Sequence, residues 1–253
     1  MESLARRAWQ LHALARQRRL AALVEPSCPI LYFGNTQRYG DSPLRVATVG
    51  LNPSLAEFPS NDPYQRFPAT AAIHGSLDAG MLSGYTKALD DYFRIAPYKG
   101  WFNPSFEQML RGLGASFYDD AAPSTAVHTD LCSPLATNPT WTGLVPSDQA
   151  TLQAEGVELW HELIERLQPD VLLVSIRREY LRLIRFPVIR QLGHIITVER
   201  DNPYTIEAWR TRLGSGNEPL VVFGQAAQKP FGLIGGVDQR RVGEHLRTVL
   251  DAG

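Results

Sequence analysis

The chain has 253 residues, of which 44% are hydrophobic and 20% are charged, and its formal net charge is −1. That length is enough to bury a substantial core in one large domain or at most two. No apolar run approaches the roughly 20 residues of a membrane-spanning helix, and the two cysteines are too few for a disulfide framework or a four-thiolate metal site. We therefore expect a cytoplasmic protein with no cofactor, no metal cluster and no membrane partner.

The first third of the chain predicts one helix, one confident strand and one long loop. Apolar residues recur at helical spacing from about residue 2 to residue 24, opposite an arginine-rich face, and Pro26 ends the pattern. Val46–Gly50 is an apolar run with β-branched residues and is typical of a buried strand. Residues 52–84 are rich in Pro, Gly, Asn and Ser, which indicates a long surface excursion, and such loops are usually functional or disordered.

The remainder alternates helices with apolar strands. The expected helices are 84–96, 104–113, 147–167 and a final helix capped by Asp238, and the expected strands are 126–132, 171–175, 195–199 and 220–224. This alternation predicts an α/β fold, a three-layer sandwich with helices on both faces of a mostly parallel central sheet. We expect a single domain over residues 1–253, because no shift in composition divides the chain.

Two further local patterns leave alternatives open. The aromatic residues between Tyr92 and Phe102 are suited to line a groove for single-stranded nucleic acid, and equally to pack at a helix junction. The string Gly214-Ser215-Gly216 is one residue too short for a nucleophile elbow and predicts a hairpin turn.

Polar residues follow four of the predicted strands, at the edge where open α/β sheets bind their ligands. The chain has no Gly-x-Ser-x-Gly, no Gly-x-x-x-x-Gly-Lys and no His-Glu-x-x-His, so common hydrolase, kinase and zinc-peptidase functions are not supported by their own motifs. The polar strand ends are Gly50-Leu51-Asn52-Pro53-Ser54, His128-Thr129-Asp130, Ser175-Ile176-Arg177 and Gly224-Gln225. An asparagine can hold a water or a substrate edge without carrying charge, although Gly-x-Asn-Pro also simply turns a chain.

Val46–Ser54 resembles the first motif of the uracil-DNA glycosylase superfamily, especially its mismatch-specific and single-strand-selective branches. There a strand ends in Gly-hydrophobic-Asn-Pro-Gly, and here Ser54 replaces the last glycine. The resemblance implies a glycosylase-like three-layer fold in which Asn52 positions the water that attacks the sugar. It also implies that Gly50 and Leu51 lie against the base and that Ser54 lies against the DNA. It covers this motif well and the strand order loosely.

Two more positions are carried over from the superfamily. Phe67 stands about one loop after the first motif, where an aromatic ring sandwiches the extruded base, although such a ring also serves to plug a long loop. Asp130 stands where an asparagine reads the uracil edge. An ionised carboxylate only accepts hydrogen bonds, so Asp130 suits the exocyclic amine of cytosine and repels the O4 of uracil. Asp130 is also suited to cap the Pro-rich turn that follows it.

The last motif of the superfamily, His-Pro-Ser or Asn-Pro-Ser, is missing. Gln225 stands in its place, and an amide donor stabilises a departing base less well than an imidazole does. We expect Gln228 and Lys229 to contact DNA, and Phe231, or alternatively Leu233 or Ile234, to act as an intercalating wedge. Lys229 also leaves a Schiff-base mechanism open.

These residues predict a monofunctional DNA glycosylase that hydrolyses the N-glycosidic bond of a flipped damaged or modified base. Its partner is duplex or single-stranded DNA, its product is an abasic site, and its setting is DNA repair or defence against phage whose DNA carries modified cytosine. Two alternatives remain. One is a non-catalytic nucleic-acid-binding protein with the same fold, and the other is a hydrolase of free nucleosides.

Overall fold

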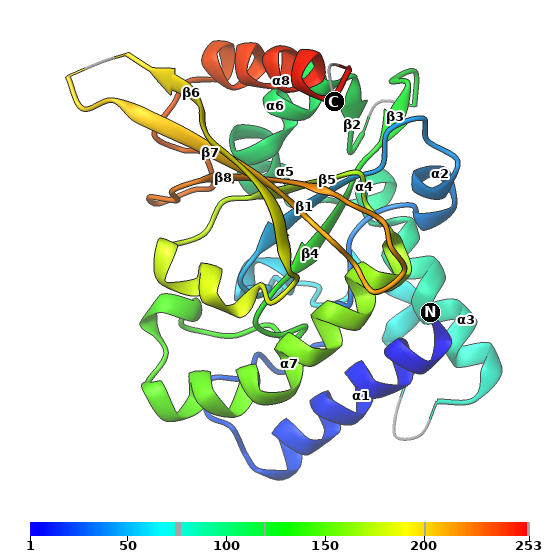
Figure 1. Ribbon diagram of the computed structural model, residues 1–253. Helices are drawn as coiled ribbons and strands as arrows, with labels where there is room; N and C mark the ends of the chain where they lie inside the picture. The colour runs from blue at the N-terminus through cyan, green and yellow to red at the C-terminus, as the bar shows by residue number, and fades with distance from the viewer. Residues whose placement is uncertain (74–76, 119, 200, 252–253) are drawn as a thin grey trace. The chain divides into compact units, whose positions relative to one another are not determined.

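The computed structural model describes residues 1–73, 77–118, 120–199 and 201–251 (Figure 1). It shows an α/β protein with a mostly parallel six-stranded sheet in the order β4-β1-β5-β8-β7-β6. The bounds are β1 Val46–Gly50, β4 Val127–Asp130, β5 Val171–Val174, β6 Val188–Val198, β7 Tyr204–Thr211 and β8 Leu220–Gly224. The α/β class and the mostly parallel sheet expected from the sequence are confirmed.

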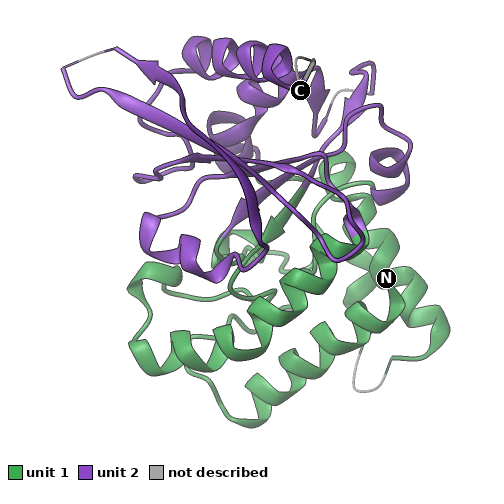
Figure 2. Cartoon of the chain, in the orientation of Figure 1, with its two compact units in different colours: residues 1–35, 51–98, 128–166 green, residues 36–50, 99–127, 167–253 purple. Residues whose placement is uncertain are grey.

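The chain divides into two compact units, each assembled from three separate stretches (Figure 2). Unit 1 comprises residues 1–35, 51–98 and 128–166, and unit 2 comprises residues 36–50, 99–127 and 167–253. Asn52 and Asp130 therefore belong to unit 1, while Gln225 belongs to unit 2. The expectation of one domain over residues 1–253 stays a prediction.

Most of the sheet belongs to unit 2. β5 pairs in parallel with β1 on one side and β8 on the other, with Leu172 opposite both Ala47 and Val221. All residues of these three strands are buried, as expected for central parallel strands that read as continuous apolar runs. β7 and β6 extend the sheet in antiparallel fashion. The sequence predicted only the second half of β6 and missed β7, whose buried residues merely alternate along the strand.

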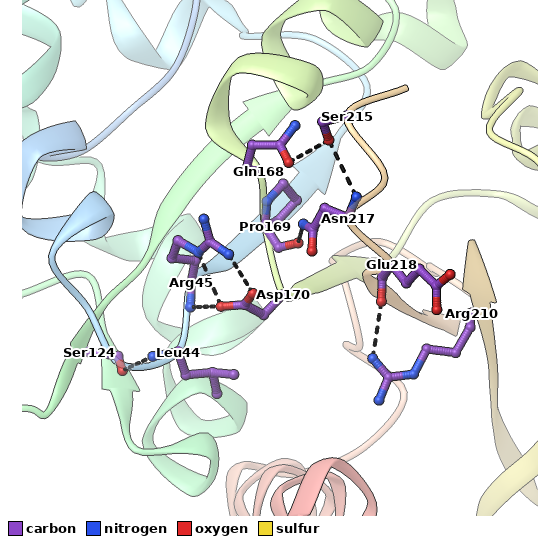
Figure 3. A network of polar contacts seen from close by, with 10 residues as sticks. All are labelled: Leu44, Arg45, Ser124, Gln168, Pro169, Asp170, Arg210, Ser215, Asn217 and Glu218. Atoms are coloured by element: carbon purple, nitrogen blue, oxygen red, sulfur yellow. Dashed lines mark hydrogen bonds and ion pairs between the residues drawn. The ribbon is translucent and has the colours of Figure 1, made fainter. Parts of the chain in front are cut away.

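A polar network closes the amino ends of the parallel strands in unit 2 (Figure 3). Immediately before β1, the Arg45 guanidinium donates to both carboxylate oxygens of Asp170, at 2.7 and 3.2 Å, and the Arg45 backbone N–H adds a bond of 2.8 Å. Asn217 donates to the carbonyl of Pro169 at 2.7 Å. The predicted turn at residues 214–216 is confirmed between β7 and β8, and Gly216 supplies the positive φ of +92° that it needs.

The other elements of unit 2 are short apart from the C-terminal helix α8 (Gly236–Asp251). α8 lies beside α6 (Gln108–Leu113) in Figure 1. The helices approach so closely that a Cβ on Gly243 would lie 2.1 Å from the carbonyl oxygen of Met109. The remaining elements are α2 Thr36–Gly40, α5 Lys99–Phe102, a π-helical turn at Asn103–Glu107, the strand pair β2 Ala115–Ser116 and β3 Ser124–Thr125, and a 3-10 segment at Arg178–Leu183.

Unit 1 is mostly helical. Its helices are α1 Glu2–Gln17, α3 Ala79–Asp90, α4 Tyr92–Ile95 and α7 Pro146–Leu167, with 3-10 turns at Leu55–Glu57, Pro68–Thr70 and Trp141–Gly143. α7 confirms the predicted helix at 147–167. A Cβ on Gly156 would lie 2.1 Å from the carbonyl oxygen of Cys132, so only glycine lets α7 approach the chain after β4 this closely. None of the described helices combines the length and the apolar character needed to cross a bilayer.

Two predictions for unit 1 need correction. α1 ends at Gln17 rather than near residue 24, because Arg19 takes a positive φ of 53° and Leu23 instead forms a β-bridge with Thr137. The stretch 52–84 is a surface excursion only in part: residues 60–62 are exposed, but others are not. Phe58 and Phe67 are almost completely buried there, so the loop contributes to the core of unit 1. Residues 74–76 of this loop lie outside the described residues.

Candidate functional site in unit 1

Asn52 is held at the start of unit 1's second stretch, two residues beyond the end of β1. Its side-chain nitrogen Nδ2 donates to the carbonyl of Pro53 at 2.8 Å, the carbonyl of Leu135 at 3.2 Å and the hydroxyl of Thr137 at 2.9 Å. Three acceptors around one NH₂ group fix the rotation of the amide. Among the described residues, none donates a hydrogen bond to Asn52 Oδ1. The amide therefore presents a fixed carbonyl acceptor.

The residues around Asn52 explain its place. Leu51 accepts a hydrogen bond of 2.8 Å from the backbone N–H of Cys132, which follows β4. Ser54 forms a β-bridge with Thr137, and its hydroxyl accepts from the Ala56 N–H at 3.3 Å, which caps the next 3-10 turn. Ser54 has extended backbone, with φ −118° and ψ 172°, so this conformation does not need the glycine of the superfamily motif.

Asp130 ends β4 and its side chain is only 5% exposed. One carboxylate oxygen lies 3.6 Å from His128 Nε2, which is longer than a hydrogen bond. Between these two residues, the Thr129 hydroxyl accepts a 3.0 Å hydrogen bond from Trp160 on α7, which anchors the strand end in unit 1. The Asp130 carboxylate is thus placed in a buried environment with acceptor capacity to spare.

Glu57 is a second buried carboxyl group near Asp130, and the sequence analysis missed it. Its side chain is 7% exposed, and it accepts a 2.6 Å hydrogen bond from the phenol of Tyr92 on α4. Burial raises the pKa of Glu57 to about 7, and the nearby charge of Asp130 acts in the same direction. The hydrogen bond from Tyr92 and the charge of Arg66 oppose that rise. Near neutral pH, Glu57 therefore exists as both acid and carboxylate.

Arg66 was also missed. Its side chain is 12% exposed, and its Nε lies 3.5 Å from Glu57 Oε2, close enough for an ion pair but with no hydrogen bond made. Nε is buried and has no hydrogen-bond partner among the described residues. The guanidinium carbon lies 5.9 Å from the centre of the Tyr98 ring, a cation–π distance. A nearly buried guanidinium without its hydrogen bonds is costly unless something else supplies them.

Phe67 lies directly after Arg66, and its ring is enclosed. It stacks on Tyr92 at 5.4 Å and on Phe58 at 5.7 Å between ring centroids, and Phe33 lies 6.5 Å away. With no exposed surface, Phe67 has no face open to an extruded base in this structure. Its position supports the plug interpretation that the sequence left open.

The remaining predicted residues lie in unit 2. Gly50 is the buried last residue of β1. Gln225 follows β8, and its amide oxygen accepts a hydrogen bond from the Arg178 backbone N–H at 3.2 Å. Its NH₂ group donates no hydrogen bond to the described residues. Gln228 and Lys229 are exposed.

Phe231 needs correction as a wedge. Its ring is fully buried, it contacts Phe106 edge-to-face at 5.8 Å, and its backbone N–H donates to the Ser175 hydroxyl at 2.7 Å. A ring held in this way packs the core of unit 2. Of the two alternatives named from the sequence, Leu233 is 37% exposed and Ile234 is buried.

The predicted residues divide between the two units, and the hydrogen bonds of Asn52 go to Pro53, Leu135 and Thr137 rather than to Asp130 or Arg66. Unit 1 holds Leu51, Asn52, Ser54, Phe67 and Asp130, and it adds Glu57, Arg66 and Tyr92; unit 2 holds Gly50, Gln225, Gln228, Lys229 and Phe231. The only sequence signal for Arg66 was its position next to Phe67. Glu57 carried none, because its partner Tyr92 lies 35 residues away.

Unit 1 offers a fixed carbonyl acceptor at Asn52 and, around Glu57, two buried carboxyl groups and a guanidinium whose Nε–H is unused. These groups suit the orientation of a water and the recognition of a flat polar ligand. Across the described ranges, His, Cys, Asp and Glu side chains form no group of three or more arranged to hold a metal ion. The sequence matches no protein-family model, and no curated protein matches it either.

Proposed function

We propose that the protein is a DNA glycosylase that hydrolyses the N-glycosidic bond of a base flipped out of DNA and leaves an abasic site. The observation that carries the proposal is the fixed Asn52 amide, whose nitrogen is engaged by Pro53, Leu135 and Thr137 while its oxygen remains available. The resemblance of residues 46–54 to the first motif of the uracil-DNA glycosylase superfamily supplies the reaction. A glycosylase-like three-layer arrangement is part of the same proposal.

The chemistry of such a reaction suits an amide. The C1′–N bond breaks with dissociative character, and the sugar becomes an oxocarbenium-like cation that even a weak nucleophile attacks. A water molecule that attacks such a cation does not have to be deprotonated first by a base, so its orientation matters more. An amide oxygen held rigidly by its own nitrogen's hydrogen bonds orients one water proton and so aims the water's lone pair.

The base recognised is proposed to carry an exocyclic amine, as cytosine and its modified forms do. Asp130 supports this, because its buried carboxylate has acceptor capacity that the 3.6 Å contact with His128 does not use. A keto oxygen facing this carboxylate would be repelled, whereas an amine donates to it. Modified cytosines of phage DNA fit this chemistry, and they would place the protein in antiviral defence rather than in general repair.

The test is a panel of oligonucleotides, duplex and single-stranded, each carrying one base: uracil, thymine opposite guanine, cytosine, hydroxymethylcytosine or glucosylated hydroxymethylcytosine. Alkali-labile abasic sites are counted. We expect product from an amine-bearing base, and we expect Asp130→Asn to shift the preference toward a keto base.

Three results would contradict these statements. An unchanged preference in Asp130→Asn would refute the role given to that carboxylate. Absence of product from every oligonucleotide, with salt-dependent DNA binding intact, would favour the non-catalytic DNA-binding alternative. Cleavage of free nucleosides with indifference to DNA would favour the nucleoside hydrolase.

A further inference from the structure

The Arg66 guanidinium is a poorly satisfied charged group of unit 1. Its side chain is 12% exposed, and its buried Nε–H has no hydrogen-bond partner among the described residues. Oε2 of Glu57 lies 3.5 Å from Arg66 Nε without making a hydrogen bond to it, and the same oxygen accepts the 2.6 Å hydrogen bond from Tyr92. A guanidinium carries five N–H donors in a planar fork. Where the protein provides no acceptor for such a donor, a ligand is expected to provide one.

The surroundings of Arg66 identify the kind of ligand. The Tyr98 ring lies over the guanidinium and is 36% exposed, so this side of the group leads toward solvent. The aromatic ring of Tyr98 favours a flat heterocycle over a tetrahedral, strongly hydrated anion. The carboxyl groups of Glu57 and Asp130 lie near one another, and their negative charge opposes a permanent dianion such as phosphate. The same negative charge opposes a neutral carbonyl oxygen much less, because that oxygen gains charge only during the reaction.

We propose that Arg66 is a catalytic residue that donates hydrogen bonds to a carbonyl oxygen of the flipped base and stabilises the negative charge that the base acquires as it departs. This inference rests on the proposed glycosylase function. It supplies, from within unit 1, the leaving-group stabilisation that the superfamily assigns to a histidine and that this chain lacks.

The C1′–N bond breaks, and its electron pair stays on the base, where it is shared with the adjacent ring carbonyl that Arg66 binds. The oxygen of water, oriented by Asn52, forms the new bond to C1′. One proton of that water ends on the base nitrogen through solvent. The products are the neutral base and an abasic sugar bearing a hydroxyl, with no oxidation or reduction.

A leaving-group comparison tests the proposal through a readout that misfolding would not produce. Single-turnover rates are measured on paired oligonucleotides carrying cytosine or 5-fluorocytosine, and uracil or 5-fluorouracil, with wild type, Arg66→Gln and the exposed control Arg94→Gln. Fluorine withdraws electrons from the ring, so the departing anion of the fluorinated base depends less on stabilisation by Arg66. We expect Arg66→Gln to lose about 10²–10³-fold on the parent base, as when an oxyanion donor is removed, and clearly less on the fluorinated base. Equal losses on both bases would overturn the proposal.

A second measurement separates this inference from the glycosylase proposal itself. The Nε–H signals of ¹⁵N-arginine-labelled protein are recorded, and the Arg66 signal is identified by its loss in Arg66→Lys. Free cytosine, free uracil and inorganic phosphate are then added in turn. We expect a free base to shift the Arg66 signal and phosphate to leave it unchanged. A shift without turnover would refute the glycosylase function but keep the base site. No shift with either base, or a shift with phosphate alone, would overturn the proposal.

Discussion

Two arginine–carboxylate pairs in this molecule have opposite construction. Arg45 and Asp170, at the amino ends of the parallel strands, make two side-chain hydrogen bonds and a third from the backbone, while both side chains are about one-third exposed. Arg66 and Glu57 in unit 1 are far more buried, yet they lie 3.5 Å apart and make no hydrogen bond to each other. The better-buried pair is therefore the less satisfied one.

We interpret this difference as that between a pair that stabilises the fold and a pair that, in our proposal, binds a ligand. Removing charges from water is costly, and a buried pair recovers that cost only with good geometry and full hydrogen bonding. Arg45 and Asp170 meet this condition where β1 and β5 begin. Arg66 and Glu57 do not, and unsatisfied buried groups of this kind are expected at functional sites.

The contrast between the two pairs holds only if the segment around Arg66 is well packed. A substitution of Phe67 tests the packing of that segment. Its ring is fully buried against Phe58 and Tyr92. We expect Phe67→Ala to lower the free energy of unfolding by about 3–5 kcal/mol, as for other buried phenylalanines. Urea titration followed by circular dichroism measures this. A loss below about 1 kcal/mol would show that the segment is not packed as described.

The raised pKa of Glu57 predicts that the free energy of unfolding depends on pH. The group has a usual pKa of 4.5 and a folded pKa of about 7, so the folded state binds the proton more tightly than the unfolded state. Stability is therefore greatest below pH 4.5 and falls as the pH rises toward 7. The full effect is on the order of 3 kcal/mol. The charged or titratable neighbours are Tyr92, Arg66 and Asp130.

This dependence is measured as the difference in unfolding free energy between wild type and Glu57→Gln. We expect the stability of wild type relative to the variant to fall between pH 4.5 and about pH 7. Above that range we expect the difference to become constant. A flat difference from pH 4 to pH 8, or one that rises with pH, would refute the assignment.

The smallest expected effects come from disabling each pair in turn. Asp170→Asn leaves Arg45 without its charged acceptor, and we expect a loss of about 1–3 kcal/mol in unfolding free energy. Arg66→Gln removes a charge whose buried Nε–H makes no hydrogen bond, and Glu57 can bind a proton once that charge is gone, so we expect a smaller loss than for Asp170→Asn. Thermal unfolding of both variants under one buffer condition makes the comparison. The reverse order of stabilities would invert our interpretation of the two pairs.

The sequence predicted the elements whose signals are local. β1 and β8 are short apolar runs, and α7 is a long periodic segment, so hydrophobic pattern alone was enough to find them. β7 escaped because only alternate residues are buried, and α1 was drawn too long because the apolar spacing continues past Gln17 after the backbone has turned.

The candidate site was predictable only in part, for the same reason. Asn52 and Asp130 follow strands and were found by position. Glu57 and Arg66 gain their character from Tyr92 and Tyr98, which lie more than 30 residues along the chain. Burial and pairing at such separation are tertiary facts that no local pattern carries.

The most direct test of the account is the single-turnover rate of abasic-site formation in wild type, Asn52→Ala and Asn61→Ala, on the best base of the panel. Asn61 is an exposed asparagine of the same loop and serves as the matched control. We predict that Asn52→Ala loses at least about 10²-fold in rate, because the water is no longer oriented, while DNA affinity and the Asn61→Ala rate stay at the wild-type level. An Asn52→Ala protein that cleaves as fast as wild type would contradict the account.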